Sequence, residues 1–430
     1  MKEKIQALQA YLDSAKSVYH STEGLKKQLD AAGYQYLSES EDWKLTAGGK
    51  YYMTRGGTAL IAFRIPEGEP RGFMMSAGHS DRPTFKMKEN PELVGQYTRL
   101  AVEPYGGMII SPWLDRPLSL AGRVLVETEN GVETKIVDLD EDLFMIPNVA
   151  IHMNRKVNEG YSWNPAVDTI PLMGGKDAKG KLWQRLEKEA GGKILGHDLY
   201  LYIRQKSTVW GLEQEYISAA AIDDLTCIWC CLEGFLAAEP SRSVALFCTF
   251  DSEEVGSNSM QGAGSNLLEL VMLRICRAMG YSVDPMLSQS FMVSADNAHA
   301  LHPNHPEYAD PNNAPVMNGG VTLKFNANQK YTTDGVSSAV FRYVCKKAGV
   351  TAQTYCNRAD IPGGSTLGHI SMTHVSIHSA DVGLPQLAMH SCYETAGVRD
   401  IEDMIKVMTC FYSCSLQSDQ DGNFQIVSIE

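Results

Sequence analysis

The chain has 430 residues, more than most single domains contain, and its length indicates two domains. A composition of 44% hydrophobic and 21% charged residues is typical of a globular protein. The formal net charge of -13 argues against a nucleic-acid partner, because binding phosphates requires a basic surface. No apolar run reaches the roughly 18 to 20 residues that span a membrane, and residues 1–4 lead into no apolar signal core. We therefore expect a cytoplasmic protein without a membrane partner.

The N-terminal part predicts helix followed by strands. Residues 2–33 place apolar side chains on one helical face. Residues 51–64 predict two strands joined by a turn at Gly56-Gly57. The apolar run 72–77 predicts a buried strand, and the polar sequence 78–81 is then expected at the C-terminal end of that strand.

Short alternating strands replace this pattern from about residue 93. The clearest signal is Asn130-Gly131, which lies between the alternating runs 123–126 and 134–137 and predicts a hairpin. Strand character continues at 197–205. We interpret residues 93–212 as an inserted, mostly-β domain.

After residue 215 helices alternate with strands, an order that predicts a sheet covered by helices. The apolar run 244–250 is typical of a strand buried on both faces. The fold class is therefore α/β, a three-layer α/β/α sandwich with a mixed sheet, formed by residues 1–92 and 213–430 as one discontinuous domain. The predicted elements of its second part are helices at 225–238, 265–280, 336–348 and 401–417 and strands at 244–250 and 291–294.

Ten cysteines lack the spacing of a disulfide framework, and in a cytoplasmic protein we expect reduced thiols. Cys227, Cys230 and Cys231 include a C-x-x-C pattern, which can bind metal or serve redox chemistry. They lie in the apolar run 225–236 with helical spacing, and this context favours buried core cysteines.

Five polar clusters follow predicted strands or precede predicted helices. Ligand sites of open α/β sheets form at the carboxyl ends of the strands, so residues distant in sequence can converge there. Carboxylates and imidazoles without thiolates suit zinc, manganese or cobalt at a catalytic site. The clusters are His79-Ser80-Asp81, Asp223-Asp224, Asp251-Ser252-Glu253-Glu254, Asp296-Asn297-Ala298-His299 and His390.

Each cluster alone has an ordinary structural explanation. A histidine and an aspartate two residues apart often form a helix cap or a surface pair, and adjacent glutamates usually lie on a solvated face. Together the clusters meet the demands of a two-metal centre, because ions about 3.5–4 Å apart need a bridging carboxylate between them. Each ion also needs a terminal carboxylate and an imidazole, and one further carboxylate must move protons. The clusters provide all six groups.

Longer stretches around these clusters resemble the M18 metallopeptidase family, which includes the aspartyl aminopeptidases. FDSEEVGS at 250–257 and SADNAHA at 294–300 are specific to that family, and the matches run in order along most of the chain. The others are AGHSDRP at 77–83, VEPYGG at 102–107, DRPLSLAGR at 115–123, AIHMNR at 150–155, DIPGGST at 360–366 and QLAMHS at 386–391.

The resemblance implies a zinc-peptidase-like fold and a di-zinc aminopeptidase. Such an enzyme hydrolyses the N-terminal peptide bond of short peptides with a metal-bound hydroxide, and cobalt or manganese are alternative ions. The implied ligands are His79 and Asp296 for one ion, Glu254 and His390 for the other, and Asp223 as the bridge.

Four further residues receive roles from the same resemblance. Glu253 is implied as the general base, and Asp81 as the residue that orients the imidazole of a ligand. His299 would help to polarise the scissile carbonyl, and His152 of the insertion would reach into a neighbouring subunit's site. The residues alone favour a half-buried His152 bonded to a backbone carbonyl. The family forms tetrahedral dodecamers built from dimers, so we expect a homo-oligomer.

Two departures from the family pattern concern the bridge and the substrate. The family often has RLDN around the bridging carboxylate, where this chain has Ala221-Ile222-Asp223-Asp224. Eukaryotic members carry a lysine at the position of Asn328. The resemblance implies a preference for acidic N-terminal residues. Because that lysine suits acidic side chains, its absence argues against a strict form of this preference.

Two other functions remain open from the sequence. A related binuclear amidase or deacylase that acts on a non-peptide would use the same ligands. A non-catalytic oligomeric shell protein would retain only the fold, and the intact base and ligand set argue against it.

Overall fold

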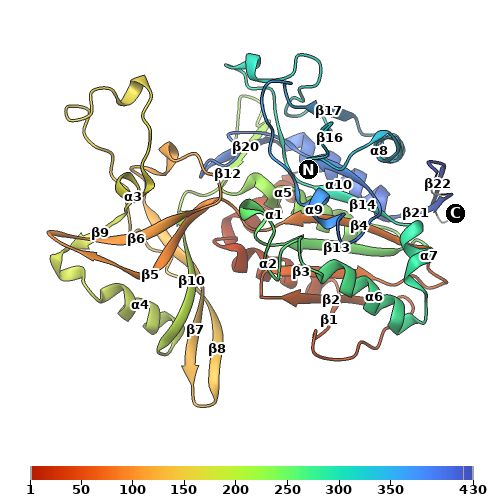
Figure 1. Ribbon diagram of the computed structural model, residues 1–430, viewed down its shortest axis with the longest axis horizontal. Coiled ribbons are helices and arrows are strands. Elements are labelled where there is room, and N and C mark those ends of the chain that lie inside the picture. Colours follow the sequence, from red (N-terminus) through yellow and green to blue (C-terminus); the bar gives the residue numbers. More distant parts are fainter. Residues whose placement is uncertain (1, 420, 429–430) are drawn as a thin grey trace.

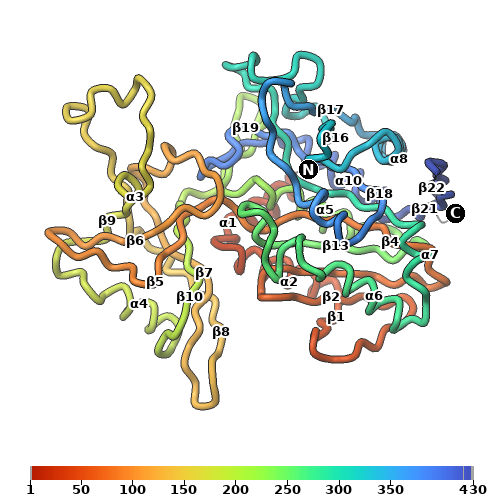
Figure 2. Tube along the Cα trace, viewed as in Figure 1, coloured from red at the N-terminus to blue at the C-terminus, as the bar shows by residue number. Residues whose placement is uncertain are grey.

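The computed structural model describes residues 2–419 and 421–428, which form two bodies side by side (Figure 1). The larger body contains a nine-stranded mixed sheet between layers of helices, and this confirms the predicted α/β sandwich. The chain leaves the larger body in orange after the strand that ends at His79, builds the smaller body, and returns in green (Figure 2). The strands, in sheet order, are β1 (Gln35–Tyr36), β2 (Lys50–Arg55), β3 (Ala59–Arg64), β13 (Val244–Phe250), β4 (Phe73–His79), β14 (Phe291–Ala295), β18 (His378–Gly383), β16 (Val321–Phe325) and β17 (Ala352–Cys356).

The central strands β13, β4, β14 and β18 are parallel, so their carboxyl ends meet at one edge. Their side chains alternate between two cores: in β4, Met74 faces one helical layer, whereas Phe73 and Met75 face the other. The first layer contains α1 (Lys2–Ser14), α2 (Val18–Ala31), α5 (Ile222–Ala237), α8 (Gly335–Ala348) and α10 (Val398–Tyr412). The second contains α6 (Leu267–Met279), α7 (Val283–Ser288) and α9 (Leu367–Ser371).

Two predicted helices differ from the structure. The expected helix at 2–33 is two helices, because Ser17 takes an extended conformation between them. The final helix ends at Tyr412 rather than at 417, and residues beyond it form β21 (Cys414–Ser418) paired with β22 (Phe424–Ser428). Leu416 of β21 packs in the core next to α10, and a short apolar run of this kind does not by itself distinguish helix from strand.

The cysteine cluster of α5 confirms the expected core role. Cys227, Cys230 and Cys231 are buried and form no disulfide within the described part of the chain. Burial raises the pKa of each of these three thiols above its usual value, so the thiolate form that binds metals is disfavoured.

The smaller body is a six-stranded antiparallel sheet. The hairpin expected at Asn130-Gly131 is confirmed, since Thr128 pairs with Gly131. The division of the chain at residues 93 and 212 stays a prediction. The elements are β8 (Gly131–Asp138), β7 (Leu118–Thr128), β10 (Ile194–Ile203), β5 (Thr84–Val94), β6 (Tyr97–Tyr105) and β9 (Leu172–Gly175), in sheet order, with α3 (Pro165–Asp168) and α4 (Lys181–Ala190).

A five-stranded sheet brings together segments from both sides of α5, and it carries residues of the candidate site. In order it contains β11 (Thr208–Trp210), β12 (Tyr216–Ala219), β20 (Glu394–Gly397), β19 (Pro385–Leu387) and β15 (Ala298–His299). In the described chain, no helix has the length and apolar character needed to cross a membrane. Single turns of 3-10 helix lie at Ser111–Trp113, Val157–Glu159, Lys176–Ala178, Glu253–Val255 and Pro306–Tyr308.

Candidate metal centre and active site

The predicted ligands lie at the carboxyl edge of the central parallel strands. His79 is the last residue of β4 and pairs with Phe250, the last residue of β13, so the turn that bears Glu254 starts beside it. Asp296 follows β14 directly. Asp223 lies in the first turn of α5, and His390 lies in the loop after β19. All five residues therefore meet at one place.

Three turns that bear these residues contain left-handed backbone. Ala221, Ser252 and His390 have φ values of 57°, 63° and 67°. Side chains with a Cβ atom rarely adopt this conformation, which costs about 1–3 kcal/mol and persists where the surroundings hold it. The fold thus accepts local strain in order to aim the side chains of this edge.

The Asp223 carboxylate lies between two imidazoles. Its Oδ1 is 3.4 Å from Nε2 of His79, and its Oδ2 is 3.5 Å from Nε2 of His390. Each imidazole has a second carboxylate beside it: Asp296 Oδ1 is 4.0 Å from the first, and Glu254 Oε2 is 3.3 Å from the second. Each side of Asp223 thus has one imidazole and one further carboxylate, which is the set that two neighbouring ions with one bridging carboxylate require.

The carboxylates at this edge outnumber the imidazoles, and each type shifts the pKa of the other. Burial lowers the pKa of the His390 imidazole, but the Asp223 and Glu254 carboxylates outweigh burial and raise that pKa to about 10. Burial also opposes a charged His79, yet Asp223 and Asp81 raise its pKa well above the usual value. Burial and then Asp223 raise the pKa of Glu254 well above its usual value. The buried carboxylates repel one another, and a divalent cation would relieve that repulsion.

The residues present fit a bound metal. Oδ1 of Asp223, Oδ1 of Asp224 and Oε1 of Glu254 are buried, and they accept no hydrogen bond within the described part of the chain. Two groups have ligand atoms within 4.8 Å of one another: His79, Asp223 and Glu254, and Asp223, Asp224 and Asp296. Imidazoles and carboxylates are ligands that zinc accepts in catalytic sites. The assignment of individual ligands stays a prediction.

Asp81 connects the histidine to the neighbouring glutamates. Its Oδ1 is 3.5 Å from Nδ1 of His79. Its two oxygens accept hydrogen bonds from the backbone N–H groups of Glu253 and Glu254, each at 3.1 Å, and Oδ2 accepts a third from the hydroxyl of Tyr105 at 2.7 Å. The same Nδ1 of His79 lies 3.2 Å from the backbone carbonyl oxygen of Asp81 and donates to it. Asp81 thus contacts the imidazole mainly through its backbone, while its carboxylate fixes the turn that carries both glutamates.

Glu253 lines a cavity of about 230 Å³ together with the metal-ligand candidates. Its side chain is half-buried, and burial raises its pKa to about 8, while His79 acts in the opposite direction. A carboxyl group with a pKa close to neutral can both accept and donate a proton during a reaction.

The same cavity is lined by His299 and by a cation that the sequence analysis missed. The His299 ring lies 5.8 Å from the ring of Tyr355. Lys324 is buried, with its Nζ 3.3 Å from Asp296 Oδ2. The available signal was a lysine within the apolar strand 321–325. Asn328 instead lies on an exposed turn and lines a different hollow.

His152 is not brought to this cluster. It is exposed in a turn of the smaller body, and it is absent from the residues that line the cavity. The loop of residues 147–164 that contains it projects away from the larger body, in gold at the upper left of Figure 1.

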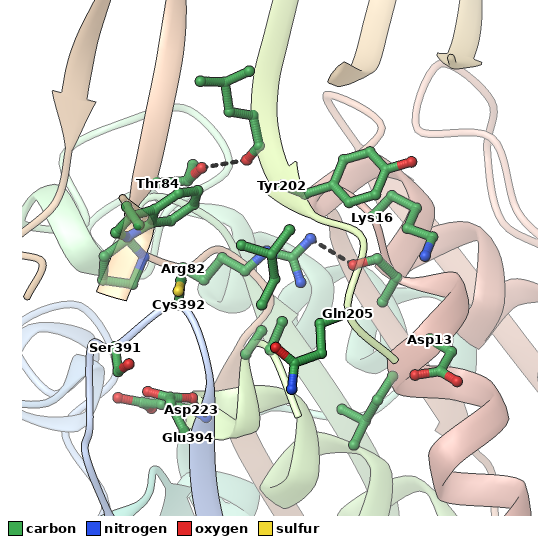
Figure 3. A pocket seen from close by; sticks show the side chains of 18 residues that line it. Asp13, Lys16, Arg82, Thr84, Tyr202, Gln205, Asp223, Ser391, Cys392 and Glu394 are labelled. Atoms are coloured by element: carbon green, nitrogen blue, oxygen red, sulfur yellow. Dashed lines mark hydrogen bonds between the residues drawn. The ribbon is translucent and has the colours of Figure 1, made fainter. Parts of the chain in front are cut away.

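Two other positions around His390 were not singled out from the sequence. Its Nδ1 donates to the carbonyl oxygen of Gly107 at 2.6 Å, and Gly107 lies in the matched stretch 102–107. Its backbone N–H donates to Glu394, four residues further on. Figure 3 shows Glu394 beside Asp223, at the rim of a small cavity that Arg82 also lines.

Three comparisons place these observations among known proteins. The sequence profile described as "Aminopeptidase I zinc metalloprotease (M18)" matches residues 11–412. A protein of Clostridium novyi (strain NT), named "Probable M18 family aminopeptidase 2", is 41% identical over 432 residues, covering 96% of this chain and 100% of that protein.

Solved structures agree in fold. The structure titled "Cryo-EM structure of the Ape4 and Nbr1 complex" matches with a TM-score of 0.89 and 32% identity, over 94% of this chain and 84% of that one. The structure of the S. cerevisiae mApe1 dodecamer matches with a TM-score of 0.84 and 27% identity, over 95% of each chain.

Proposed function

Since the chain belongs to the M18 family of zinc aminopeptidases, we propose that it removes the N-terminal residue of short peptides at a centre that binds two zinc ions per subunit. The protein is a metallo-aminopeptidase, a hydrolase of peptide bonds. Bound zinc would supply Lewis-acid chemistry, which activates a water and polarises the scissile carbonyl. The proposed ligands are His79 and Asp296 for one ion, Glu254 and His390 for the other, and Asp223 between them.

The chain's own residues would hold and move the protons. Glu253 faces the cavity with a pKa of about 8, which suits a base that takes a proton from the attacking water and delivers it to the leaving amine. Asp81 would hold the His79 ring at Nδ1, through its backbone carbonyl at 3.2 Å and its carboxylate at 3.5 Å, so that Nε2 points to the centre. His299, on the cavity wall, is placed to donate a hydrogen bond to the scissile carbonyl oxygen.

One observation carries this proposal: the two oxygens of Asp223 face two different imidazoles at 3.4 and 3.5 Å. Dialysis against a chelator should abolish activity, and zinc, cobalt or manganese should restore part of it. The zinc-loaded protein should contain two ions per chain. Full activity in metal-free protein would refute the proposal. If the protein cleaves N-acylated amino acids and does not cleave substrates that have a free N-terminus, the amidase alternative is favoured.

We propose a preference broader than acidic N-terminal residues. Lys324, which lines the cavity, is already paired with Asp296, and Asn328 is exposed beside a different hollow. On a panel of aminoacyl reporter substrates we expect aspartyl and glutamyl compounds to be cleaved alongside neutral ones. Cleavage restricted to the acidic pair would contradict this proposal.

We propose that the protein assembles into a closed homo-oligomer, of twelve subunits like the matched yeast structure. The loop of residues 147–164 and α3 expose apolar side chains whose burial would favour association. Sedimentation at micromolar concentration should show a species much larger than a dimer, and a monomer would contradict the proposal. These side chains, with exposed fractions, are Val149 (51%), Ile151 (48%), Met153 (83%) and Val167 (67%).

A further inference from the structure

Behind the candidate metal centre lies a carboxylate with no role in the steps above. Glu394 is the first residue of β20, and it is only 2% exposed. It forms no ion pair among the described residues: the nearby guanidinium of Arg82 donates instead to the carbonyl oxygen of Ala15 (Figure 3). A buried carboxylate without a cationic partner needs other donors to remain buried.

The donors that Glu394 uses are the backbones of two proposed metal ligands. Its Oε2 accepts the N–H of Asp223 at 3.0 Å, and its Oε1 accepts the N–H of His390 at 2.7 Å. The Nε2 of Gln386 adds a weaker contact at 3.4 Å. Both oxygens of one side chain are thus engaged by the backbones of two proposed ligands.

The backbones of both proposed ligands depart from regular helix and strand conformations. Asp223 interrupts the regular helical dihedral angles at the start of α5, with φ of -80° and ψ of 113°. His390 has a left-handed φ of 67°. A single planar carboxylate that binds both amides fixes the separation of the two residues before any ion arrives.

We propose that Glu394 is a positioning residue of the metal centre: it holds the backbones of Asp223 and His390 so that their side chains converge on one ion. The inference rests on the proposed function. Two of the three ligands proposed for that ion, Asp223, Glu254 and His390, depend on Glu394. The other proposed ion, at His79 and Asp296, depends on Glu394 only through the bridging Asp223, because His79 is contacted by Asp81 instead. Loss of Glu394 should therefore lower the binding affinity most for the ion that His390 would ligate.

A positioning role of Glu394 can be distinguished from a purely structural one, because the chain contains a matched control residue. Asp400 is also fully buried, and its carboxylate accepts the backbone N–H groups of Asn318 and Gly320 at 2.5 and 2.8 Å. None of these residues lines the metal-site cavity. Asp400→Asn thus removes the same kind of interaction from a place where it serves the fold alone.

The test measures zinc binding and thermal unfolding of the apoprotein for wild type, Glu394→Gln and Asp400→Asn, with zinc affinity taken from competition with a chromogenic chelator. In Glu394→Gln the amide nitrogen faces an N–H donor, so one of the two bonds is lost. We expect the affinity of one of the two zinc-binding steps to fall about 10- to 100-fold, as for other residues that orient ligands. Asp400→Asn should lower the unfolding temperature and leave zinc affinity unchanged.

Wild-type zinc affinity in Glu394→Gln, or an equal loss in Asp400→Asn, would overturn the inference. If Glu394→Gln does not fold, Glu394→Asp decides, because it keeps the carboxyl group but is too short to reach both amides. Unchanged zinc affinity in that variant also overturns the inference. His390→Ala separates the two proposals. If it binds zinc as wild type does, the proposed metal centre fails, whereas if it loses an ion and the Glu394 variants do not, only the role of Glu394 fails.

Discussion

The two bodies of this protein prepare a catalytic site in different ways. The larger body places five candidate ligands at the carboxyl edge of its central parallel strands, where they lie close to one another, with His390 half-buried and the other four side chains buried. The smaller body carries His152 on an exposed turn, away from that edge. Metal binding is thus built into one chain, whereas a contribution of His152 requires a second subunit.

The smaller body nevertheless contacts the candidate metal centre of its own chain. The hydroxyl of Tyr105, at the end of β6, donates to Asp81, and the carbonyl of Gly107 accepts from Nδ1 of His390. Both imidazoles therefore depend on one segment of the smaller body, Asp81 mediating the contact to His79. The comparison predicts variants of three kinds. The first lower turnover or metal binding at the edge of the larger body, the second affect the site of a neighbouring subunit, and the third weaken contacts between the two bodies.

The largest effect is expected within the larger body, at two adjacent glutamates. Glu253→Gln removes the proposed base and should lower turnover by about 10²- to 10⁴-fold while both metal ions stay bound. Glu254→Ala removes a proposed ligand, so zinc content itself should fall. Paired measurements of turnover and of zinc per chain distinguish the two variants. Equal loss of metal in both would contradict the assignment.

The next effect tests whether the smaller body serves a neighbouring subunit. His152→Ala should leave zinc content and oligomer size unchanged and lower turnover by roughly a hundredfold, as the loss of an oxyanion donor does elsewhere. In a monomeric arrangement this exposed residue would be neutral. Wild-type turnover in the variant would show that His152 serves another purpose.

Mixed oligomers make the same test sharper. Subunits with His152→Ala retain an intact base, and subunits with Glu253→Gln retain an intact His152. Combining the two should restore part of the activity, because some sites receive both groups. If labelled subunits demonstrably exchange and no activity returns, the shared site does not exist.

Tyr105→Phe should give a smaller effect, because it removes one of the hydrogen bonds that fix Asp81. We expect zinc affinity or turnover to fall about tenfold, the lower end of the range for partners of metal ligands. Tyr200→Phe is the control, since it changes the neighbouring ring, whose centroid is 5.7 Å away. Equal effects of the two variants would indicate a packing defect instead of a change at Asp81.

The sequence predicted the larger body well because its signals are local. The apolar run 244–250 coincides with β13, and the five polar clusters lie at strand ends or helix starts, where the sheet gathers them. Glu394 was not predicted, because a residue that bonds to backbone amides leaves no spacing pattern. Lys324 was missed although a lysine within the apolar strand 321–325 was a signal. The break at Ser17 depends on one residue's dihedral angles, which periodicity does not report.

The smallest effect concerns the junction of the two bodies and its pH dependence. His20 of α2 is half-buried there, with Nδ1 2.9 Å from the hydroxyl of Ser17. The adjacent Tyr19 donates to Asp198 of β10, and the Arg123 guanidinium of β7 lies over its ring. Burial lowers the pKa of His20 from 6.5 to about 4, against an opposing contribution from Asp138.

Because the pKa of His20 is lower in the folded state, the unfolded chain binds more protons between pH 6.5 and 4. The stability that comes from a neutral His20 is therefore complete above pH 6.5 and is lost as the pH falls toward 4. Between pH 7.5 and 5, apoprotein of wild type should lose on the order of 1–2 kcal/mol more unfolding free energy than His20→Gln, which stays neutral throughout. Urea unfolding at both pH values measures that difference. If wild type and variant lose stability in parallel, protonation of His20 does not loosen the junction, and the acid sensitivity belongs to the buried carboxylates and imidazoles of the metal edge.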